Sequence, residues 1–231
     1  MDKIQILCTR AVDEQLINEA NDSNIFIDVL SFIDTEPIET VEVQQEINHA
    51  LLLESIVVFT SMNAVEAVAD LMYEDMPRWR IYCIGNATAE LVKQAFGDHS
   101  IAGTADTAAE LAEFIVAEGE IKEVIFFCGD QRRNELPSRL IENDIGVNEI
   151  VVYHTIEVPN KIHKEYKGIL FFSPSAVKSF FSVNRIHGDV VLFAIGTTTA
   201  ESIKNYADNK IIMAAKPTKE NLFEKLMEYF T

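Results

Sequence analysis

The chain has 231 residues, of which 37 are acidic and 19 are basic, so its formal net charge is 19 − 37 = −18. Hydrophobic residues make up 48% and charged residues 24% of the chain, which indicates a globular protein of one large domain or two smaller ones. The acidic excess excludes a general nucleic-acid binder, which needs a basic surface, and argues against docking on an anionic membrane.

Short β-rich runs alternate with helical patterns along the whole chain. The runs that predict strands are Ile4–Cys8, Asp28–Phe32, Ile56–Phe59, Arg80–Ile84, Val124–Cys128, Glu149–Tyr153, Ile169–Phe172, Val190–Ile195 and Lys210–Met213. The helical patterns between them include Val65–Tyr73, Thr88–Phe96, Ala108–Ala117, Glu135–Asn143, Ala176–Phe181, Thr199–Tyr206 and Lys219–Tyr229. Most of the strand runs are continuously apolar, and the alternation indicates βαβ units, so the sequence predicts an α/β fold with open parallel sheets.

An internal repeat indicates that there are two such sheets. Residues 59–65 reappear as 171–177, residues 84–90 as 195–201 and residues 107–111 as 218–222. The offsets are 176 − 64 = 112, 196 − 85 = 111 and 218 − 107 = 111. Three motifs at nearly one offset, each copy about 110 residues long, predict two similar α/β domains rather than a solenoid.

The two domains are not expected to follow one another along the chain. The strand–helix–strand unit at 4–32 resembles the unit at 124–153, and each ends in an extended segment with a proline. Two neighbouring crossings of the chain would form a two-stranded hinge, whereas one continuous sheet is the alternative. We therefore expect residues 1–34 and 158–231 to form one domain, residues 38–152 to form the other, and residues 35–37 and 153–157 to be hinge linkers.

The motifs that are missing from the sequence indicate in which compartment the protein works and which cofactors it does without. The three cysteines, Cys8, Cys83 and Cys128, are odd in number and far apart, as is typical of reduced thiols in a cytosolic protein. The sequence starts without the basic and long apolar regions of a signal peptide. The motifs GxG, GxxxxGK, GxSxG and HExxH are all missing. We expect a cytoplasmic protein without a membrane span, metal or other cofactor, in which the glycosylation sequons at Asn21 and Asn86 are chance matches.

Hydroxyl and amide side chains gather where the predicted strands end and helices begin. Ligands of open parallel sheets bind at the carboxyl ends of the strands, where helix N-termini offer unpaired N–H groups to carboxylates or phosphates. Residues of these types can equally be ordinary N-caps. The candidates for binding an anionic ligand are Thr60, Ser61, Asn63, Ala64, Gly85, Thr88, Ser173, Ser175, Ala176, Thr198 and Thr199.

Taken in order, these motifs resemble those of the uroporphyrinogen-III synthase family. The resemblance lies in Thr9-Arg10 and in the segments 59–65, 84–89, 127–137, 151–155, 172–176, 195–200 and 217–218, so it covers essentially the whole chain. Ala11, Cys128 and Asn134 depart from the residues that are common in the family, which leaves the role of the loop at 129–133 open.

The resemblance implies two flavodoxin-like domains joined by a two-stranded linker, with a cleft between them. It also implies a cofactor-independent lyase of porphyrin and heme biosynthesis. Such an enzyme cyclises hydroxymethylbilane, inverts the terminal pyrrole ring and releases water. This linear tetrapyrrole carries an acetate and a propionate on each ring, so it is the small-molecule polycarboxylate partner that we expect. A monomer is expected as well, and transient contact with the upstream bilane synthase stays open.

The resemblance further implies a catalytic role for Tyr153. A phenol at this position can donate a proton to the departing hydroxyl of the bilane. The alternative is a tyrosine that packs at a domain boundary.

Arg10 and Arg133 are candidates for holding carboxylates, because a guanidinium binds a carboxylate through two hydrogen bonds. Surface ion pairs are the alternative for both, and for Arg132 the ion pair is the preferred interpretation. Lys178 and Lys216 are weaker candidates.

Two other functions remain to be weighed. A non-enzymatic two-lobed protein could bind an anionic ligand such as a tetrapyrrole, but it would not need Tyr153 or the strand-end hydroxyls. A pair of response-regulator-like domains would need an acidic pair after the first strand and a phosphorylatable aspartate after a later one, and neither repeat shows them.

Overall fold

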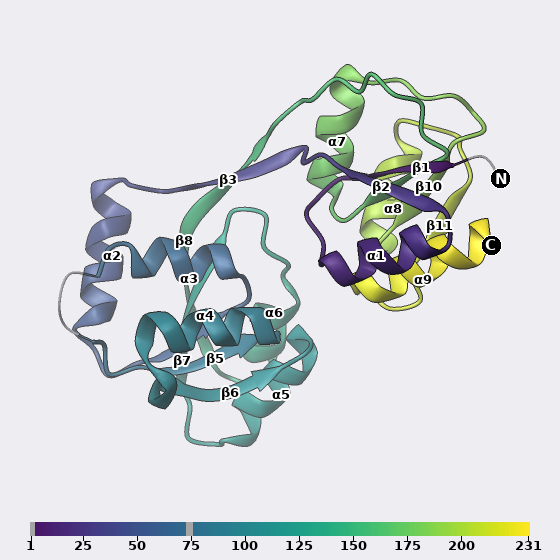
Figure 1. The fold of residues 1–231 in the computed structure, drawn as a ribbon. Coiled ribbons are helices and arrows are strands. Elements are labelled where there is room, and N and C mark those ends of the chain that lie inside the picture. Colours follow the sequence, from purple (N-terminus) through teal and green to yellow (C-terminus); the bar gives the residue numbers. More distant parts are fainter. Residues whose placement is uncertain (1–2, 73–75) are drawn as a thin grey trace. The chain divides into compact units, whose positions relative to one another are not determined.

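The chain forms two compact units, each with one sheet flanked by helices (Figure 1). The computed structural model describes residues 3–72 and 76–231. The first unit consists of the described part of Met1–Asp34 together with Ile156–Thr231, and the second of the described part of Thr35–Thr155. The predicted fold class, an α/β protein with two parallel-sheet domains, is confirmed.

The sheet of the first unit has the order β11-β10-β9-β1-β2, and all of its described pairs are parallel. This is the 2-1-3-4-5 order of flavodoxin-like sheets, whose topological switch point lies here between β1 and β9. Its strands are β1 (Ile4–Cys8), β2 (Ile25–Val29), β9 (Gly168–Phe171), β10 (Val191–Ala194) and β11 (Ile211–Met213). Its helices are α1 (Glu14–Asp22), α7 (Pro174–Val183), α8 (Thr197–Lys204) and α9 (Lys219–Phe230).

The sheet of the second unit has the order β3-β8-β7-β4-β5-β6. Without β3 this is the same arrangement with the chain order permuted, and the switch point lies between β7 and β4. The strands are β3 (Ile33–Pro37), β4 (Ile56–Phe59), β5 (Arg80–Ile84), β6 (Ile101–Ala105), β7 (Glu123–Gly129) and β8 (Gly146–Glu157). The helices are α2 (Val41–Leu51), α3 (Met62–Ala69), α4 (Asn86–Phe96), α5 (Ala108–Ala117) and α6 (Glu135–Glu142), with a 3-10 turn, η1, at Asp98–Ser100.

Both connections between the units run through strands. The boundary after Asp34 lies inside β3, and the boundary after Thr155 lies inside β8. Ile38 N–H donates to the carbonyl oxygen of Val152 (2.9 Å), and Val158 N–H donates to that of Phe32 (3.0 Å). Because the partners run in opposite directions, β3 and β8 form an antiparallel ribbon.

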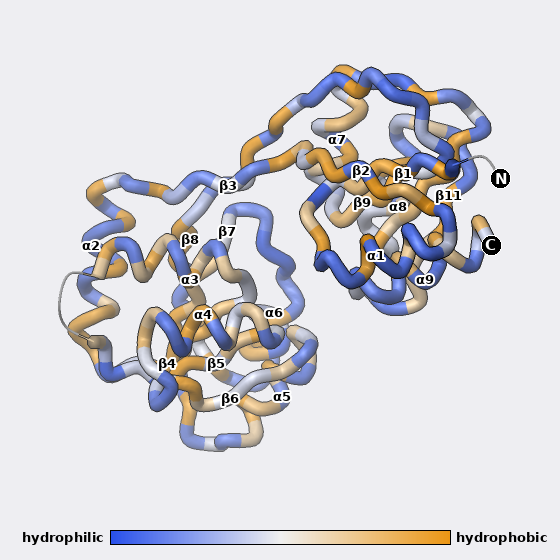
Figure 2. The backbone as a smooth tube through the Cα atoms, viewed as in Figure 1, coloured by the Kyte–Doolittle hydropathy of each residue, from blue (hydrophilic) through white to orange (hydrophobic). Residues whose placement is uncertain are grey.

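Each sheet is buried on both faces, which explains the continuous apolar runs. In β1, Ile6 and Cys8 pack with α1 and α9, whereas Leu7 packs with α7 and α8. In β4, Phe59 packs with α2, α3 and α4, whereas Val58 packs with α5 and α6. Figure 2 shows the same pattern as hydrophobic strands between helices of mixed character.

The structure moves β2 relative to the prediction, which placed a strand at Asp28–Phe32. The strand spans Ile25–Val29, because Asn24, with a φ of +63°, turns the chain so that Ile25 pairs with Ile4. The prediction was wrong because the apolar run continues beyond the strand to Phe32, which is buried outside it.

Two strands lie outside the predicted set. The ribbon strand β3 contains Asp34 and Glu36, and the edge strand β6 consists largely of small residues, so neither carries a strong strand signal. The helix expected at Val65–Tyr73 begins at Met62 and ends at Ala69, and its expected end at Tyr73 lies outside the described residues. Among the described residues, no helix has both the length and the apolar composition needed to cross a membrane.

The aromatic core of the second unit yields a stability prediction. Phe59 is fully buried, and its ring stacks on those of Phe96 and Phe127, with centroids 5.8 and 5.5 Å away. We expect Phe59→Ala to lower the free energy of unfolding by about 3–5 kcal/mol, because it leaves a cavity in a packed core. Denaturant unfolding followed by circular dichroism measures this change. Phe114→Ala is the control, since Phe114 is 53% exposed, and equal losses in both variants would contradict the prediction.

Candidate functional site

Polar residues meet at the switch point of the second unit, where the carboxyl ends of β7 and β4 are neighbours. Strand β7 ends at Gly129 and is followed by Asp130, and β4 is followed by Thr60 and Ser61. Crevices that bind ligands form at such switch points. The structure brings the predicted catalytic residue, Tyr153, to this place.

A bulge in β8 sets the direction of Tyr153. The pairing with β7 passes from Cys128↔Val151 to Gly129↔Tyr153, which leaves Val152 as an extra residue. Val152 and Tyr153 therefore pack against the same core, beside α3, whereas Val151 packs on the opposite face of the sheet. In a regular strand Tyr153 would share the face of Val151. The bulge thus turns the phenol toward the N-terminus of α3.

The ring of Tyr153 lies directly against the backbone of Gly129. A Cβ atom at Gly129 would lie 2.7 Å from the phenol oxygen and closer still to two ring carbons. Real side-chain contacts do not come so close, so only glycine fits here while the ring keeps its place.

The phenol is hydrogen-bonded and protonated. Its oxygen lies 3.1 Å from Oγ of Ser61, the N-cap of α3, which also accepts a hydrogen bond from Ala64 N–H (3.2 Å). Burial raises the pKa of Tyr153, which outweighs the opposing effect of Ser61, and the neighbouring Cys128 and Asp130 raise it further. A tyrosine with a raised pKa keeps its proton at neutral pH and can act as an acid.

The remaining strand-end residues of this unit surround the starts of α3 and α4. Thr60 and Asn63 are half-buried, and Thr88 is buried in the first turn of α4. Gly85, the N-cap of α4, has a φ of +80°, which L side chains rarely adopt. Glycine is therefore required at this position by the backbone conformation and not by a lack of space for a side chain.

The first unit has a comparable switch point between β1 and β9. Ser173 caps α7 by accepting a hydrogen bond from Ala176 N–H (3.2 Å). Thr9 Oγ1 donates to the carbonyl oxygen of Leu170 (2.8 Å), which fixes the chain just before Arg10. The Arg10 guanidinium lies 5.7 Å from the centroid of the Phe172 ring, within the range of a cation–π contact.

The predicted site residues thus fall into two groups, one in each unit. Within the second unit the structure joins Tyr153 to Ser61, and Ser61 to Ala64, by hydrogen bonds. The first unit holds Arg10, Ser173, Ser175, Ala176, Thr198 and Thr199, and the second holds Thr60, Ser61, Asn63, Ala64, Gly85, Thr88, Arg133 and Tyr153.

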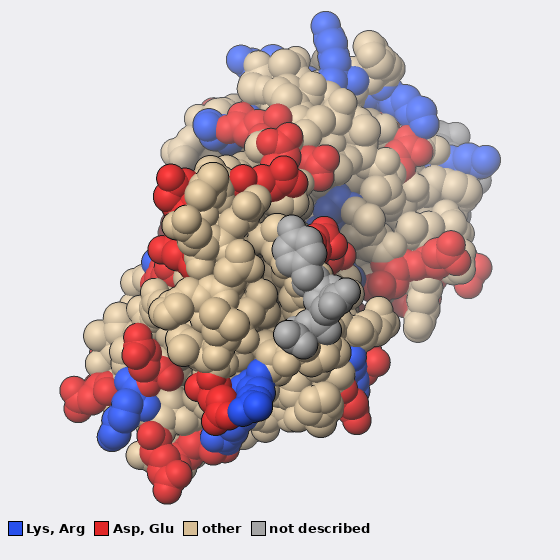
Figure 3. Space-filling view, turned by 90° about the vertical axis from the view of Figure 1, so that its left-hand side faces the viewer, with Lys and Arg blue, Asp and Glu red and all other residues tan. Residues whose placement is uncertain are grey.

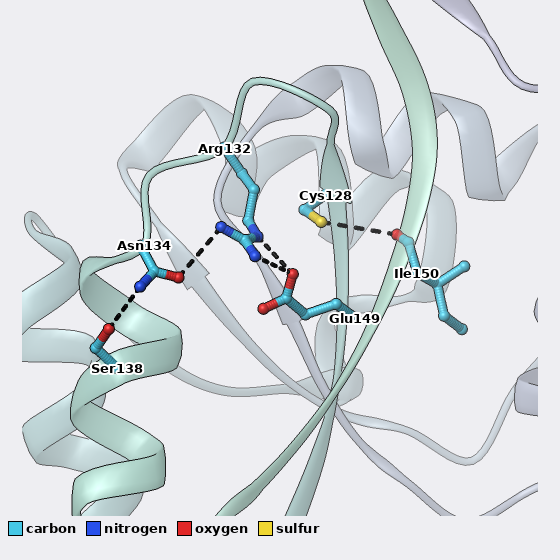
Figure 4. Close-up of polar contacts among 6 residues, drawn as sticks. All are labelled: Cys128, Arg132, Asn134, Ser138, Glu149 and Ile150. Carbon is cyan, nitrogen blue, oxygen red and sulfur yellow. Dashed lines mark hydrogen bonds and ion pairs between the residues drawn. The ribbon is translucent and has the colours of Figure 1, made fainter.

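Arg132 holds the loop that follows β7. Figure 4 shows its guanidinium directed at the carboxylate of Glu149 on β8, with which it forms an ion pair. It also donates to Asn134 Oδ1 (3.3 Å), and Asn134 Nδ2 donates to Ser138 Oγ (2.8 Å) on α6. The ion-pair interpretation therefore applies to Arg132, whose guanidinium is engaged within the protein.

Arg10 and Arg133 differ from the other arginines. Among the described residues, every other arginine forms an ion pair or donates a side-chain hydrogen bond, whereas the exposed Arg10 and Arg133 do neither. Both guanidinium groups are consequently free to hold an anion. The weaker candidate Lys178 forms an ion pair with Glu157.

Gly129 and Asp130 lie beside Tyr153 but outside the predicted set of site residues. The signal for Gly129 was a glycine placed directly after a continuous apolar strand, where a close approach of another group is common. Asp130 carries no such signal, because its partners come from β8.

The described parts of the chain contain neither a group of residues that could bind a metal ion nor a reactive thiol. Residues 3–72 and 76–231 hold no group of three or more His, Cys, Asp or Glu side chains that could bind a metal ion. Cys8, Cys83 and Cys128 are free and buried, and burial raises the pKa of each thiol to about 11. Such thiols are unreactive at neutral pH.

Comparisons with known proteins agree with this architecture. A uroporphyrinogen-III synthase of Saccharomyces cerevisiae is 24% identical over 176 residues, a match that covers 64% of this chain and 64% of the yeast protein. The uroporphyrinogen-III synthetase of Helicobacter pylori 26695 has the same fold, with a TM-score of 0.66 at 18% identity over 98% of this chain and 99% of that one. A mutant uroporphyrinogen III synthase of the extremely thermophilic bacterium Thermus thermophilus has a TM-score of 0.57 at 14% identity, and the match covers 98% of this chain and 97% of that one.

The sequence of this chain also matches a family model. The match to uroporphyrinogen-III synthase HemD runs from residue 24 to residue 224, which is 224 − 24 + 1 = 201 of the 231 residues. The chain therefore belongs to the uroporphyrinogen-III synthase (HemD) family.

Proposed function

We propose that this chain is an active uroporphyrinogen-III synthase. It takes linear hydroxymethylbilane, closes the macrocycle with inversion of the terminal pyrrole ring, and releases water. Membership in the family supports the class of reaction. The observation that carries the chemistry is the half-buried, protonated phenol of Tyr153, hydrogen-bonded to Ser61 at the switch point of the second unit.

Tyr153 acts as the acid in the first step. The bond between the terminal methylene carbon and the hydroxyl breaks, the electron pair stays on oxygen, and the phenol proton completes the departing water. The carbon becomes part of a cationic azafulvenium, which is attacked by the substituted carbon of the pyrrole ring at the other end of the bilane. The bond between that ring carbon and its own methylene bridge then breaks, and the bridge bonds instead to the unsubstituted carbon of the same ring, which inverts the ring and releases the proton of that carbon. The proton released when the macrocycle closes restores the phenol, so the cycle consumes none.

Ser61 prepares the phenol as a donor. Its oxygen accepts the Ala64 N–H, so its own proton is available for the oxygen of Tyr153. The phenol proton then points to a third group, the leaving hydroxyl. The partial positive charge at the N-terminus of α3 also stabilises negative charge on the phenol oxygen, which helps Tyr153 to give up its proton.

Binding of the substrate relies on helix N-termini and on two arginines. The acetates and propionates of the bilane are carboxylates, for which the first turns of α3, α4, α7 and α8 offer N–H groups. Arg10 and Arg133 are the described arginines without an ion pair or hydrogen bond and add two guanidinium groups. Since the bilane also cyclises without an enzyme, to the wrong isomer, the main task of the protein is to hold the chain in the shape that gives inversion.

The decisive experiment is the isomer ratio of the product. Purified protein treated with a chelator should convert hydroxymethylbilane, generated in place by bilane synthase, to the type III isomer without added metal or nucleotide. Chromatography of the products, against a reaction without this protein, measures the ratio of type III to type I. Type I product at every protein concentration would reject the enzyme, and saturable binding of the bilane in the same samples would then favour the non-enzymatic binding protein.

Substitutions at the site should separate catalysis from binding. Backbone N–H groups remain when a side chain is shortened, so Thr60→Ala, Thr88→Ala and Ser175→Ala should each lower kcat/KM by about 3- to 100-fold, the value of one hydrogen bond. Tyr153→Phe removes the proton donor and should lower kcat more than any of these variants. Steady-state kinetics on folded proteins, checked by circular dichroism, decides between the roles. Full activity in Tyr153→Phe together with none in Thr88→Ala would show that the roles are assigned to the wrong residues.

The contact between Gly129 and the phenol gives a second mutational prediction. In Gly129→Ala the new methyl group must displace the ring of Tyr153, and a shift of about 1 Å can cost as much as 100-fold in rate. We expect kcat to fall at least about tenfold, with a smaller change in KM. Gly188→Ala is the matched control, since no atom lies within 4 Å of its added Cβ, and it should keep wild-type kcat. Equal activity of the two variants would mean that the position of the ring does not matter.

A further inference from the structure

Asp130 holds three consecutive residues of β8, starting with Tyr153. Its backbone N–H donates to the carbonyl oxygen of Tyr153 (3.2 Å). Its Oδ2 lies 3.2 Å from Nδ1 of His154, and its Oδ1 accepts a hydrogen bond from Thr155 N–H (3.0 Å). One residue therefore fixes the strand immediately after the phenol-bearing position.

This contact replaces the ladder between the two strands. The pairing of β7 with β8 ends at Gly129↔Tyr153, directly after the bulge at Val152. Beyond that pair, the carboxylate of Asp130 takes the place of the next β7 carbonyl as acceptor for Thr155 N–H. On this side of β8, the stretch that follows the bulge thus depends on a side chain rather than on a backbone ladder.

The carboxylate is charged, which strengthens this hold. Burial by itself would raise the pKa of Asp130, but the hydrogen bonds from Thr155 N–H and from His154 hold it below its ordinary value. Hydrogen bonds to an ionised acceptor are about twice as strong as neutral ones.

Direct contact with the substrate does not fit this residue. Both oxygens of Asp130 already face protein donors. A carboxylate would also repel the acetates and propionates of the proposed bilane. The effect of Asp130 on the reaction must therefore pass through the residues that it holds.

We propose that Asp130 is a positioning residue for Tyr153. By tying His154 and Thr155 to the end of β7, its carboxylate keeps the preceding phenol beside Ser61, in the place where it donates its proton. This inference rests on the proposed function and adds to it a residue that touches neither the substrate nor the reacting atoms.

The test compares substitutions of Asp130 in two backgrounds. Asp130→Ala should lower kcat by about 10- to 100-fold and leave KM within about twofold, since a charged acceptor of two hydrogen bonds is lost. Asp130→Asn keeps an acceptor for Thr155 N–H, and its amide can donate to His154, so it should restore at least about a third of kcat. In the Tyr153→Phe background, Asp130→Ala should cause no further loss, because the group that it positions is already gone.

The control removes a similar set of contacts elsewhere. Asp28 in β2 accepts hydrogen bonds from Lys164 Nζ (2.7 Å) and Tyr166 Oη (3.0 Å), and Asp28→Ala should leave kcat unchanged. Circular dichroism melts check that each variant folds. If the alanine variant does not fold, Asp130→Ser replaces it in both backgrounds.

Two results would overturn the inference. Losses from Asp130→Ala and Tyr153→Phe that multiply in the double variant would show that Asp130 acts on its own. A raised KM with unchanged kcat would show that it contacts the substrate. Wild-type protein that yields only type I product would instead reject the proposed function, so the two failures are distinguishable.

Discussion

The ring of Tyr153 and the backbone of Gly129 occupy neighbouring space so tightly that no side chain fits between them. The rest of the site depends on this contact. It requires glycine at the end of β7, and it follows from the bulge that moves Tyr153 to the face of α3. Ser61 can then serve both as the cap of α3 and as the partner of the phenol. The position of the phenol is thus set by the geometry of the sheet.

The two units have the same arrangement of strands, but a tyrosine beside the end of the central strand is described in the second unit and not in the first. Cys8 pairs with Val29 in the first unit as Cys128 pairs with Val151 in the second, so Thr9 stands where the second unit has Gly129. The described ladder of β1 and β2 has no register shift, and the Thr9 hydroxyl is bonded to the carbonyl oxygen of Leu170. Both units keep the capped helix starts that suit carboxylates. The repeat in the sequence therefore covers the capped helix starts, whereas within the described residues the bulge that brings a tyrosine against a glycine occurs in the second copy.

Elements with one strong signal were predictable from the sequence. Strands β1, β4 and β5 have the predicted bounds because their largely apolar runs end at Thr9, Thr60 and Gly85. The edge strand β6 and the ribbon strand β3 escaped prediction, since small or charged residues form them only in the context of their partners. Hydrophobicity alone also placed β2 too late, because buried Phe32 lies beyond the strand.

The sequence predicted which residue types gather at the candidate site, but it did not predict the contacts between them. Strand-end hydroxyls, Tyr153 and the arginines follow from motifs. A bulge, in contrast, is a relation between two strands, and the sequence of one strand does not reveal it. Arg132 and Arg133 are adjacent and chemically identical, and only the position of Glu149 on β8 engages one and leaves the other free. Asp130 escaped for the same reason, because its role depends on the partners that β8 brings to it.

A net charge of −18 would, without screening, oppose the binding of a polycarboxylate. On the face shown in Figure 3 the acidic side chains lie in several separate groups, some of them next to lysine or arginine. Charges farther than about 8 Å from a bound anion are largely screened at physiological salt. What matters is the local field, and Asp130, the acid beside the phenol, is held by protein donors. Helix N-termini and free guanidinium groups can therefore hold carboxylates even on a chain with this much negative charge.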